Sequence, residues 1–368
     1  MLESPRGVWY AARMKRLLFL AAVLLPFCTT SCTQIYARER AYEPVEPVEP
    51  VLQPATTARA RNVVLMIGDG MGSEHVWAAW LTNKGALNIT NLPVTGFSIT
   101  TSASHAITDS AAGGTAIACG CKAINRQLGL DAEGNPRDSL AVQMRRAGKA
   151  TGLVVTKTIT DATPAAFYAH NESRYNTAAI AEALVGAGFD VLIGGGAGDF
   201  TEEQKESLKK NTQLFELAAE KHCPPASERG DWLPERVKMA LQTLEKDADG
   251  FFLMVEGSRI DTSAHANDLP ETVRETLDFD RAVGVVLEWM KAHPDTLLVV
   301  TADHQTGGLA LPGGNKEKGE VQGRFTTFNH SGVAVPVYAA GPGAERFTGV
   351  QENTALAPKI RAAAGMEP

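Results

Sequence analysis

Cysteine is scarce in this sequence, which contains five among its 368 residues. After Cys32 only Cys119, Cys121 and Cys223 follow. Cys119 and Cys121 lie too close together in the chain for a bridge within one helical or tight segment. An odd number of cysteines in this part of the chain gives no clear framework of disulfides, so none is expected.

Basic residues do not occur in blocks, and the formal net charge is -7. A protein that binds nucleic acid broadly needs a basic footprint, so a nucleic acid is not an expected partner. Small anionic substrates are still allowed, because local cations or metal ions set the field of a single site. Hydrophobic residues make up 44% and charged residues 21%, which are ordinary values for a globular protein.

Long apolar runs are also lacking, and the run at 17–25 is too short to span a bilayer as a stable anchor. Lys15 and Arg16 precede it, as in an export signal. The small residues 29–31 before Cys32 resemble a bacterial lipoprotein cleavage site, although an aliphatic residue is usual where Thr29 stands. Residues 1–32 are therefore predicted to be an export segment, ending in lipid attachment at Cys32 or in simple signal cleavage. The expected location is periplasmic, or anchored to the outer membrane of a bacterium.

A proline-containing triplet repeats over residues 43–50. Such a segment cannot pack a core, and it favours an extended spacer. We expect a tether over residues 33–60, which would let a lipid-anchored protein stand off a membrane. The remaining residues, 61–368, are numerous enough for one large domain.

Apolar runs that suit buried strands alternate with stretches that suit helices. The predicted strands are 63–67, 152–155, 190–193, 251–255, 296–300 and 335–340, and the predicted helices are about 139–147, 177–187, 233–244 and 270–292. Continuous apolar runs indicate strands buried on both faces. This alternation predicts an α/β fold of three layers, with a mostly parallel central sheet covered by helices. Pro336 suggests that the last strand lies at an edge or that the proline is near its start.

Acidic residues and histidines follow several of these predicted strands. They are Asp69 after the first strand, Glu256, Asp261 and His265 after the fourth, Asp303 and His304 after the fifth, and His330 before the last. Taken singly, such a residue is more often a cap, a turn or a surface residue. Together at one edge of a sheet they would repel one another unless cations neutralised them. Their mixture of oxygen and imidazole ligands suits zinc and magnesium.

A candidate nucleophile lies in the segment 108–116, where Ser110 is followed by small residues. These residues favour a closely packed helix whose first turn begins near Ser110. A helix amino terminus offers free N–H groups to a phosphate. The simpler interpretation is a helix N-cap formed by Thr108 or Ser110.

Taken together, the motifs resemble those of the alkaline phosphatase family from about Asn62 to Val350. The most specific are residues 109–112, 161–166, 256–265 and 301–304. The resemblance implies hydrolysis of small phosphate monoesters through a phosphoserine at a site with two Zn²⁺ and one Mg²⁺ per chain.

The resemblance also implies a role for each site residue. Asp69, Ser110, Asp303 and His304 would hold one zinc ion, Asp261, His265 and His330 the other, and Asp69, Thr163 and Glu256 the magnesium ion. Asp161 would act through the waters of the magnesium ion. Arg174 would clamp the phosphate as a planar fork, next to Asp109 in the substrate site.

Two departures from the family pattern bear on details. Thr262 stands where some bacterial members carry a lysine and animal members a histidine, which leaves the pH optimum open. About twenty residues separate Gly308 from His330, where larger members carry an insertion that crowns a dimer. A short or absent crown is expected, so a homodimer would need another interface.

Rival interpretations differ in the residues that they require. A sulfatase needs a modifiable Cys or Ser followed two residues later by Pro and then by Arg, which the segment after Ser110 lacks. A diesterase relative typically has a Thr nucleophile and no third metal site, whereas Thr163 and Glu256 are both present. A catalytically silent lipoprotein that binds phosphate or metal should have lost a ligand or the nucleophile, and none is missing.

Overall fold

A nine-stranded sheet forms the centre of the computed structural model, which describes residues 33–37 and 59–366. Its strands are, in spatial order, β14 (Gly349–Glu352), β3 (Val94–Ile99), β13 (Val335–Ala340), β8 (Thr296–Thr301), β2 (Asn62–Ile67), β7 (Phe251–Glu256), β4 (Ala150–Thr158), β5 (Val191–Gly195) and β6 (Leu214–Leu217). Within this sheet β13 is the strand that runs antiparallel to its neighbours. The predicted mostly parallel sheet is confirmed.

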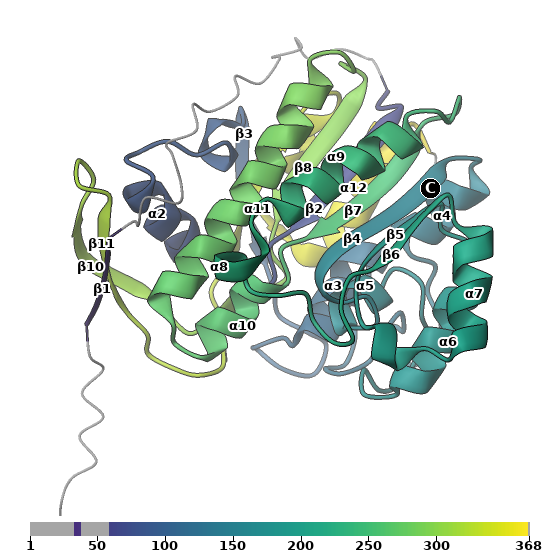
Figure 1. Ribbon diagram of the computed structural model, residues 1–368, viewed down its shortest axis with the longest axis horizontal. Coiled ribbons are helices and arrows are strands. Elements are labelled where there is room, and N and C mark those ends of the chain that lie inside the picture. Colours follow the sequence, from purple (N-terminus) through teal and green to yellow (C-terminus); the bar gives the residue numbers. More distant parts are fainter. Residues whose placement is uncertain (1–32, 38–58, 367–368) are drawn as a thin grey trace, which may run out of the picture. The chain divides into compact units, whose positions relative to one another are not determined.

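Helices cover both faces of the sheet, because successive side chains of each strand point to opposite faces. Val64 and Met66 pack into one apolar cluster with α2 (Ser73–Thr82), α9 (Trp232–Leu244) and α11 (Leu269–Met290). The alternate residues of β2 pack into a second cluster with α3 (Ser110–Cys119), α4 (Leu140–Arg146), α6 (Thr177–Ala187) and α12 (Leu356–Ala363). Figure 1 shows α9 and α11 over one face of the sheet. The predicted three layers are therefore present.

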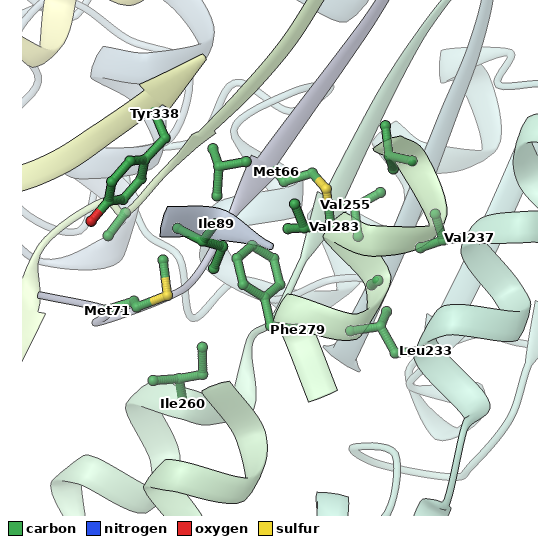
Figure 2. Close-up of a cluster of buried hydrophobic side chains, with 14 of the residues drawn as sticks. Met66, Met71, Ile89, Leu233, Val237, Val255, Ile260, Phe279, Val283 and Tyr338 are labelled. Atoms are coloured by element: carbon green, nitrogen blue, oxygen red, sulfur yellow. The ribbon is translucent and has the colours of Figure 1, made fainter. Parts of the chain in front are cut away.

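The first of these clusters shows how α11 is held against the sheet. Phe279 and Val283 of α11 are fully buried, and Figure 2 shows them beside Met66 and Val255 of the sheet. Burying one such side chain stabilises the fold by about 1.5–3 kcal/mol. The remaining α-helices of the described residues are α5 (Ala162–Ala165), α7 (Glu202–Asn211), α8 (Ala226–Arg229) and α10 (Arg259–His265).

All four predicted helices are present as α4, α6, α9 and α11, and all six predicted strands are present. The edge position allowed for the strand at 335–340 is wrong, because β13 lies between β3 and β8. Pro336 is tolerated there because β13 pairs with β8 only from Tyr338 onward. The Thr301 hydroxyl donates to the Pro336 carbonyl at 3.0 Å, which closes the gap between the two strands.

The prediction of a tether over residues 33–60 is wrong for residues 34–37, which form a strand of a separate three-stranded sheet. β1 (Gln34–Ala37) pairs antiparallel with β11 (Glu320–Arg324), which also pairs with β10 (Ala310–Asn315). Tyr36 of β1 is buried, and the Gln34 amide bonds to the backbone of Asn267 and Leu269. Residues 34–37 therefore belong to the folded domain, because β11 and the backbone of Asn267 and Leu269 bind them.

Several predicted features fall outside the described residues. The apolar run at 17–25, Cys32 and the proline repeat at 43–50 are among them. Among the described helices, none has the length and apolar character needed to cross a membrane. Cys119, Cys121 and Cys223 are free thiols.

Candidate metal and phosphate site

The register of four neighbouring strands brings the predicted site residues to one edge of the sheet. Ile67 of β2 is level with Thr301 of β8 and with Glu256 of β7. Glu256 is in turn level with Val155 of β4. Residues that follow these strands therefore meet beyond their carboxyl ends, where ligands bind in such sheets.

His330 reaches the same edge because β13 runs in the opposite direction. The amino end of β13 lies near the carboxyl end of β8, so the residues just before Val335 are close to those just after Thr301. A two-stranded sheet fixes this approach, with β12 (His330–Ser331) paired to β9 (Gln305–Thr306).

The first group of possible metal ligands consists of Asp69, Asp303 and His304, all buried. His304 Nε2 lies 3.2 Å from Asp303 Oδ2 and 3.5 Å from Asp69 Oδ1. The Ser110 hydroxyl lies 3.1 Å from the same nitrogen. All four residues predicted for one zinc ion are thus together.

The second group consists of Asp261, His265 and His330. Asp261 and His265 are four residues apart on α10 and share one face of the helix, with 3.2 Å between Asp261 Oδ1 and His265 Nε2. His330 Nε2 lies 3.6 Å from Asp261 Oδ1 and 3.1 Å from His265 Nε2. The three residues predicted for the other zinc ion converge as well.

Backbone carbonyls orient the two histidines of this group. His265 Nδ1 lies 2.5 Å from the Phe328 oxygen, and His330 Nδ1 lies 2.9 Å from the Thr108 oxygen. A proton on each Nδ1, facing its carbonyl, would leave both Nε2 atoms available to a metal ion placed between the two rings. Metal-binding histidines are commonly held in this way.

The chemistry of both groups fits bound cations. Asp69 Oδ1 and Asp303 Oδ2 are buried and find no hydrogen-bond partner among the described residues. Burial, together with repulsion from Asp261 and Asp303, raises the pKa of Asp69 well above its ordinary value. Burial and the nearby His304 lower the pKa of His330 to about 4, so its imidazole is neutral and able to bind a metal ion.

A third set of oxygen ligands, predicted for magnesium, consists of Asp69, Thr163 of α5 and Glu256 at the end of β7. Thr163 Oγ1 and Glu256 Oε2 are buried and unpaired within the described part of the chain. Burial raises the pKa of Glu256 to about 8. Asp161, which is predicted to act through the waters of the magnesium ion, is the N-cap of α5.

Ser110 is the first residue of α3, and Asp109 is its N-cap. The Asp109 carboxylate accepts from the Ala112 N–H at 3.1 Å, so the simpler alternative, in which Thr108 or Ser110 is the N-cap, is wrong. Arg174 donates to Asp109 Oδ2 at 3.3 Å and to Asp161 Oδ1 at 3.0 Å. Its side chain is 18% exposed, which excludes the alternative of a freely solvated charge.

The sequence prediction missed three buried residues that lie near these groups. Lys157 of β4 bonds to Asp69 and Asp261. Thr306 donates to Asp261 Oδ1 at 2.7 Å. His75 of α2 is fully buried, accepts from the Gly72 N–H, and has a pKa lowered to about 4 by burial. The polar motif after the fifth strand could have indicated Thr306, whereas nothing in the local sequence singles out Lys157.

Comparisons with known proteins agree with this geometry. The family model for alkaline phosphatase matches residues 60–222 and 211–323. The chain is 32% identical to alkaline phosphatase 4 of Bacillus subtilis, with 81% of this chain and 87% of that protein covered. It is also 32% identical to a streptomycin-6-phosphate phosphatase of Streptomyces griseus, over 84% of this chain and 91% of that protein.

Solved structures show the same relationship. The alkaline phosphatase of the Antarctic bacterium TAB5 superposes with a TM-score of 0.80 at 32% identity, over 85% of this chain and all of that one. The alkaline phosphatase of Thermus thermophilus shares the fold with a TM-score of 0.76 at 23% identity, over 87% of this chain and 94% of that one. Because the family model matches residues 60–222 and 211–323 and a relative is 32% identical over 81% of this chain, the chain belongs to the alkaline phosphatase family.

Proposed function

We propose that this enzyme hydrolyses phosphate monoesters through a phosphoserine formed on Ser110, with two zinc ions and one magnesium ion as cofactors. Membership of the family supports monoester hydrolysis and a requirement for metal ions. The observation that carries the finer proposal is the position of the Ser110 hydroxyl. It lies 3.1 Å from His304 Nε2, at the amino end of α3.

Ser110 and Arg174 would hold the phosphoryl group between them. The free N–H groups at the start of α3 favour a negatively charged group beside Ser110. The Arg174 guanidinium is a planar fork that suits two phosphate oxygens. Asp109 and Asp161 hold this fork from behind, which limits its motion before substrate arrives.

Two groups of residues would bind the zinc ions. Asp69, Asp303, His304 and Ser110 form one site, and Asp261, His265 and His330 form the other. Imidazole and carboxylate ligands suit zinc. Bound cations would lower the pKa of the serine hydroxyl and offset the charge of the phosphate. A structure of a TAB5 variant has magnesium in one of its sites, and the oxygen-only set of Asp69, Thr163 and Glu256 suits that ion here.

The reaction would proceed as two displacements. The Ser110 oxygen forms a bond to phosphorus as the bond to the leaving alcohol breaks, and the alcohol departs with a proton. Water then attacks phosphorus, the bond to Ser110 breaks, and inorganic phosphate leaves. Ser110 regains its proton and is ready for another substrate molecule.

Replacing Ser110 with alanine tests the nucleophile. We expect Ser110→Ala to keep both zinc ions, because it removes only one ligand from one of the two sites. The variant should no longer form the acid-stable ³²P-labelled enzyme when it is mixed with a ³²P-labelled monoester. Ser207→Ala, in α7, is the matched control and should retain labelling. A residual rate within about tenfold of the parent, a barrier change below roughly 1.4 kcal/mol, would exclude Ser110 as the main nucleophile. Parallel assays with a diester and a sulfate ester should give much lower rates than the monoester.

Export and lipid attachment at Cys32 are part of the same proposal, and the motif at 29–32 supports them. The expected result is recovery of the protein with membranes, and loss of lipid labelling in Cys32→Ala. A wild-type protein found entirely in the soluble exported fraction would contradict lipid attachment.

A further inference from the structure

Lys157 places a positive charge inside the site. It lies near the end of β4, is 6% exposed, and points among carboxylates from three other elements. Its Nζ is 3.1 Å from Asp69 Oδ2, 3.1 Å from Asp261 Oδ2 and 3.7 Å from Asp161 Oδ2. A lysine almost never becomes buried unless its charge is paired.

These contacts divide the two oxygens of Asp69 between two neighbourhoods. Oδ1 faces His304 at 3.5 Å and belongs to the first zinc group. Oδ2 faces Lys157 at 3.1 Å. If Asp69 bound both a zinc ion and a third ion, the third ion would need Oδ2, because Oδ1 faces the first zinc group. Lys157 already binds Oδ2.

Asp161 shows the same competition. Its Oδ1 accepts from Arg174, and its Oδ2 faces Lys157. The two remaining oxygens of the third set, Thr163 Oγ1 and Glu256 Oε2, are those without a hydrogen-bond partner among the described residues. Side-chain cations therefore engage Asp69 and Asp161, whereas Thr163 Oγ1 and Glu256 Oε2 are left open to an ion.

We propose that the Lys157 ammonium competes with magnesium for Asp69 Oδ2, so that magnesium enters the third set by displacing Lys157 and binds more weakly than the two zinc ions. This inference rests on the proposed function, since it assigns the cation of one part of that site. The physical reason is that two cations a few ångströms apart repel strongly in a buried site and cannot share Asp69 Oδ2. The flexible stem of lysine allows the ammonium to leave when magnesium is abundant.

The test is the metal content of the folded holoenzyme, measured apart from activity. Zinc-loaded wild type, Lys157→Met and Lys149→Met are dialysed to equilibrium against graded magnesium, and both metals are measured by mass spectrometry. Lys157→Met should bind a third ion with an affinity for magnesium roughly tenfold or more tighter than wild type, because the competing charge is gone. Lys149 is the matched control, since it lies just before the same strand and donates to the Arg61 and Asp249 carbonyls.

The wild-type titration by itself can overturn the proposal. Three ions per chain, with the third bound as tightly in wild type as in Lys157→Met or as tightly as the two zinc ions, would show that Lys157 does not compete. If Lys157→Met fails to fold, the wild-type titration still tests the proposal, because a third ion bound as tightly as the two zinc ions would exclude competition by Lys157. Failure of the proposed function looks different, because it would remove the two zinc ions or the Ser110 labelling whatever the magnesium content.

Discussion

Replacing Gly113 with alanine tests whether the small residues of α3 set the position of the nucleophile. Gly113 lies one turn after Ser110 and faces the segment that follows β8. A Cβ atom at this position would lie 3.0 Å from the Asp303 carbonyl oxygen and 3.2 Å from Asp303 Cβ. Neither neighbour is the flexible end of a side chain, so α3 or the Asp303 segment must move by a few tenths of an ångström.

Two opposing effects determine the magnitude. Alanine is favoured over glycine in a helix by about 1 kcal/mol. Overpacking a buried contact costs about 1–3 kcal/mol. We therefore expect Gly113→Ala to lower the free energy of unfolding by about 1 kcal/mol. The displacement would separate Ser110 from His304, now 3.1 Å apart, and lower kcat/KM for a monoester by roughly tenfold.

Gly186→Ala is the matched control, because Gly186 is an exposed residue of α6 and a Cβ atom at its position would have no neighbour within 4 Å. It should raise the free energy of unfolding by up to about 1 kcal/mol and leave kcat/KM unchanged. Urea unfolding and steady-state hydrolysis of an aryl phosphate measure both quantities. If Gly113→Ala is stabilised as much as Gly186→Ala and retains full activity, the close approach of α3 to Asp303 does not determine the position of Ser110.

Two further predictions concern buried charges outside the site. Burial raises the pKa of Asp280 from 3.8 to about 6, despite hydrogen bonds from Ile89 and Asn88. Between these values the folded state binds more protons than the unfolded state, so this carboxyl lowers stability by about 3 kcal/mol as the pH rises from about 4 to 6. In metal-free protein, Asp280→Asn should remove that part of the pH dependence; an unchanged slope would contradict it. Arg229, 2% exposed, binds Glu275 and Asp278 at 2.5 and 2.6 Å. Arg229→Met should cost about 3 kcal/mol in urea unfolding, because it leaves buried carboxylates short of a partner, and a loss below about 1 kcal/mol would refute this.

The central part of the site could be predicted because its residues follow the most regular elements. Buried parallel strands give continuous apolar runs, and the residues just after them meet at one edge whatever the order of the strands. Asp69, Glu256 and Asp303 lie together for this reason. Their metals and individual roles came from the family resemblance and stay predictions.

The parts that sequence reasoning missed depend on contacts made far along the chain. Lys157 stands between two threonines and has the local appearance of an exposed strand end, and its burial depends on carboxylates from β2, α5 and α10. β1 has four residues, and its strand conformation depends on β11, far along the chain. The place of β13 inside the sheet depends on its direction, which an apolar run does not indicate.

The pairing of β1 has a consequence for how a lipid would hold the enzyme. Thr33 is the single residue between Cys32 and this strand, and the proline repeat comes after the strand instead of before it. A lipid on Cys32 would therefore be separated from β1 by one residue. The proline-rich stretch would be part of the connection between β1 and β2. Such an enzyme would be held close against its membrane in a restricted orientation, with its reach set by the folded domain and not by a long flexible arm.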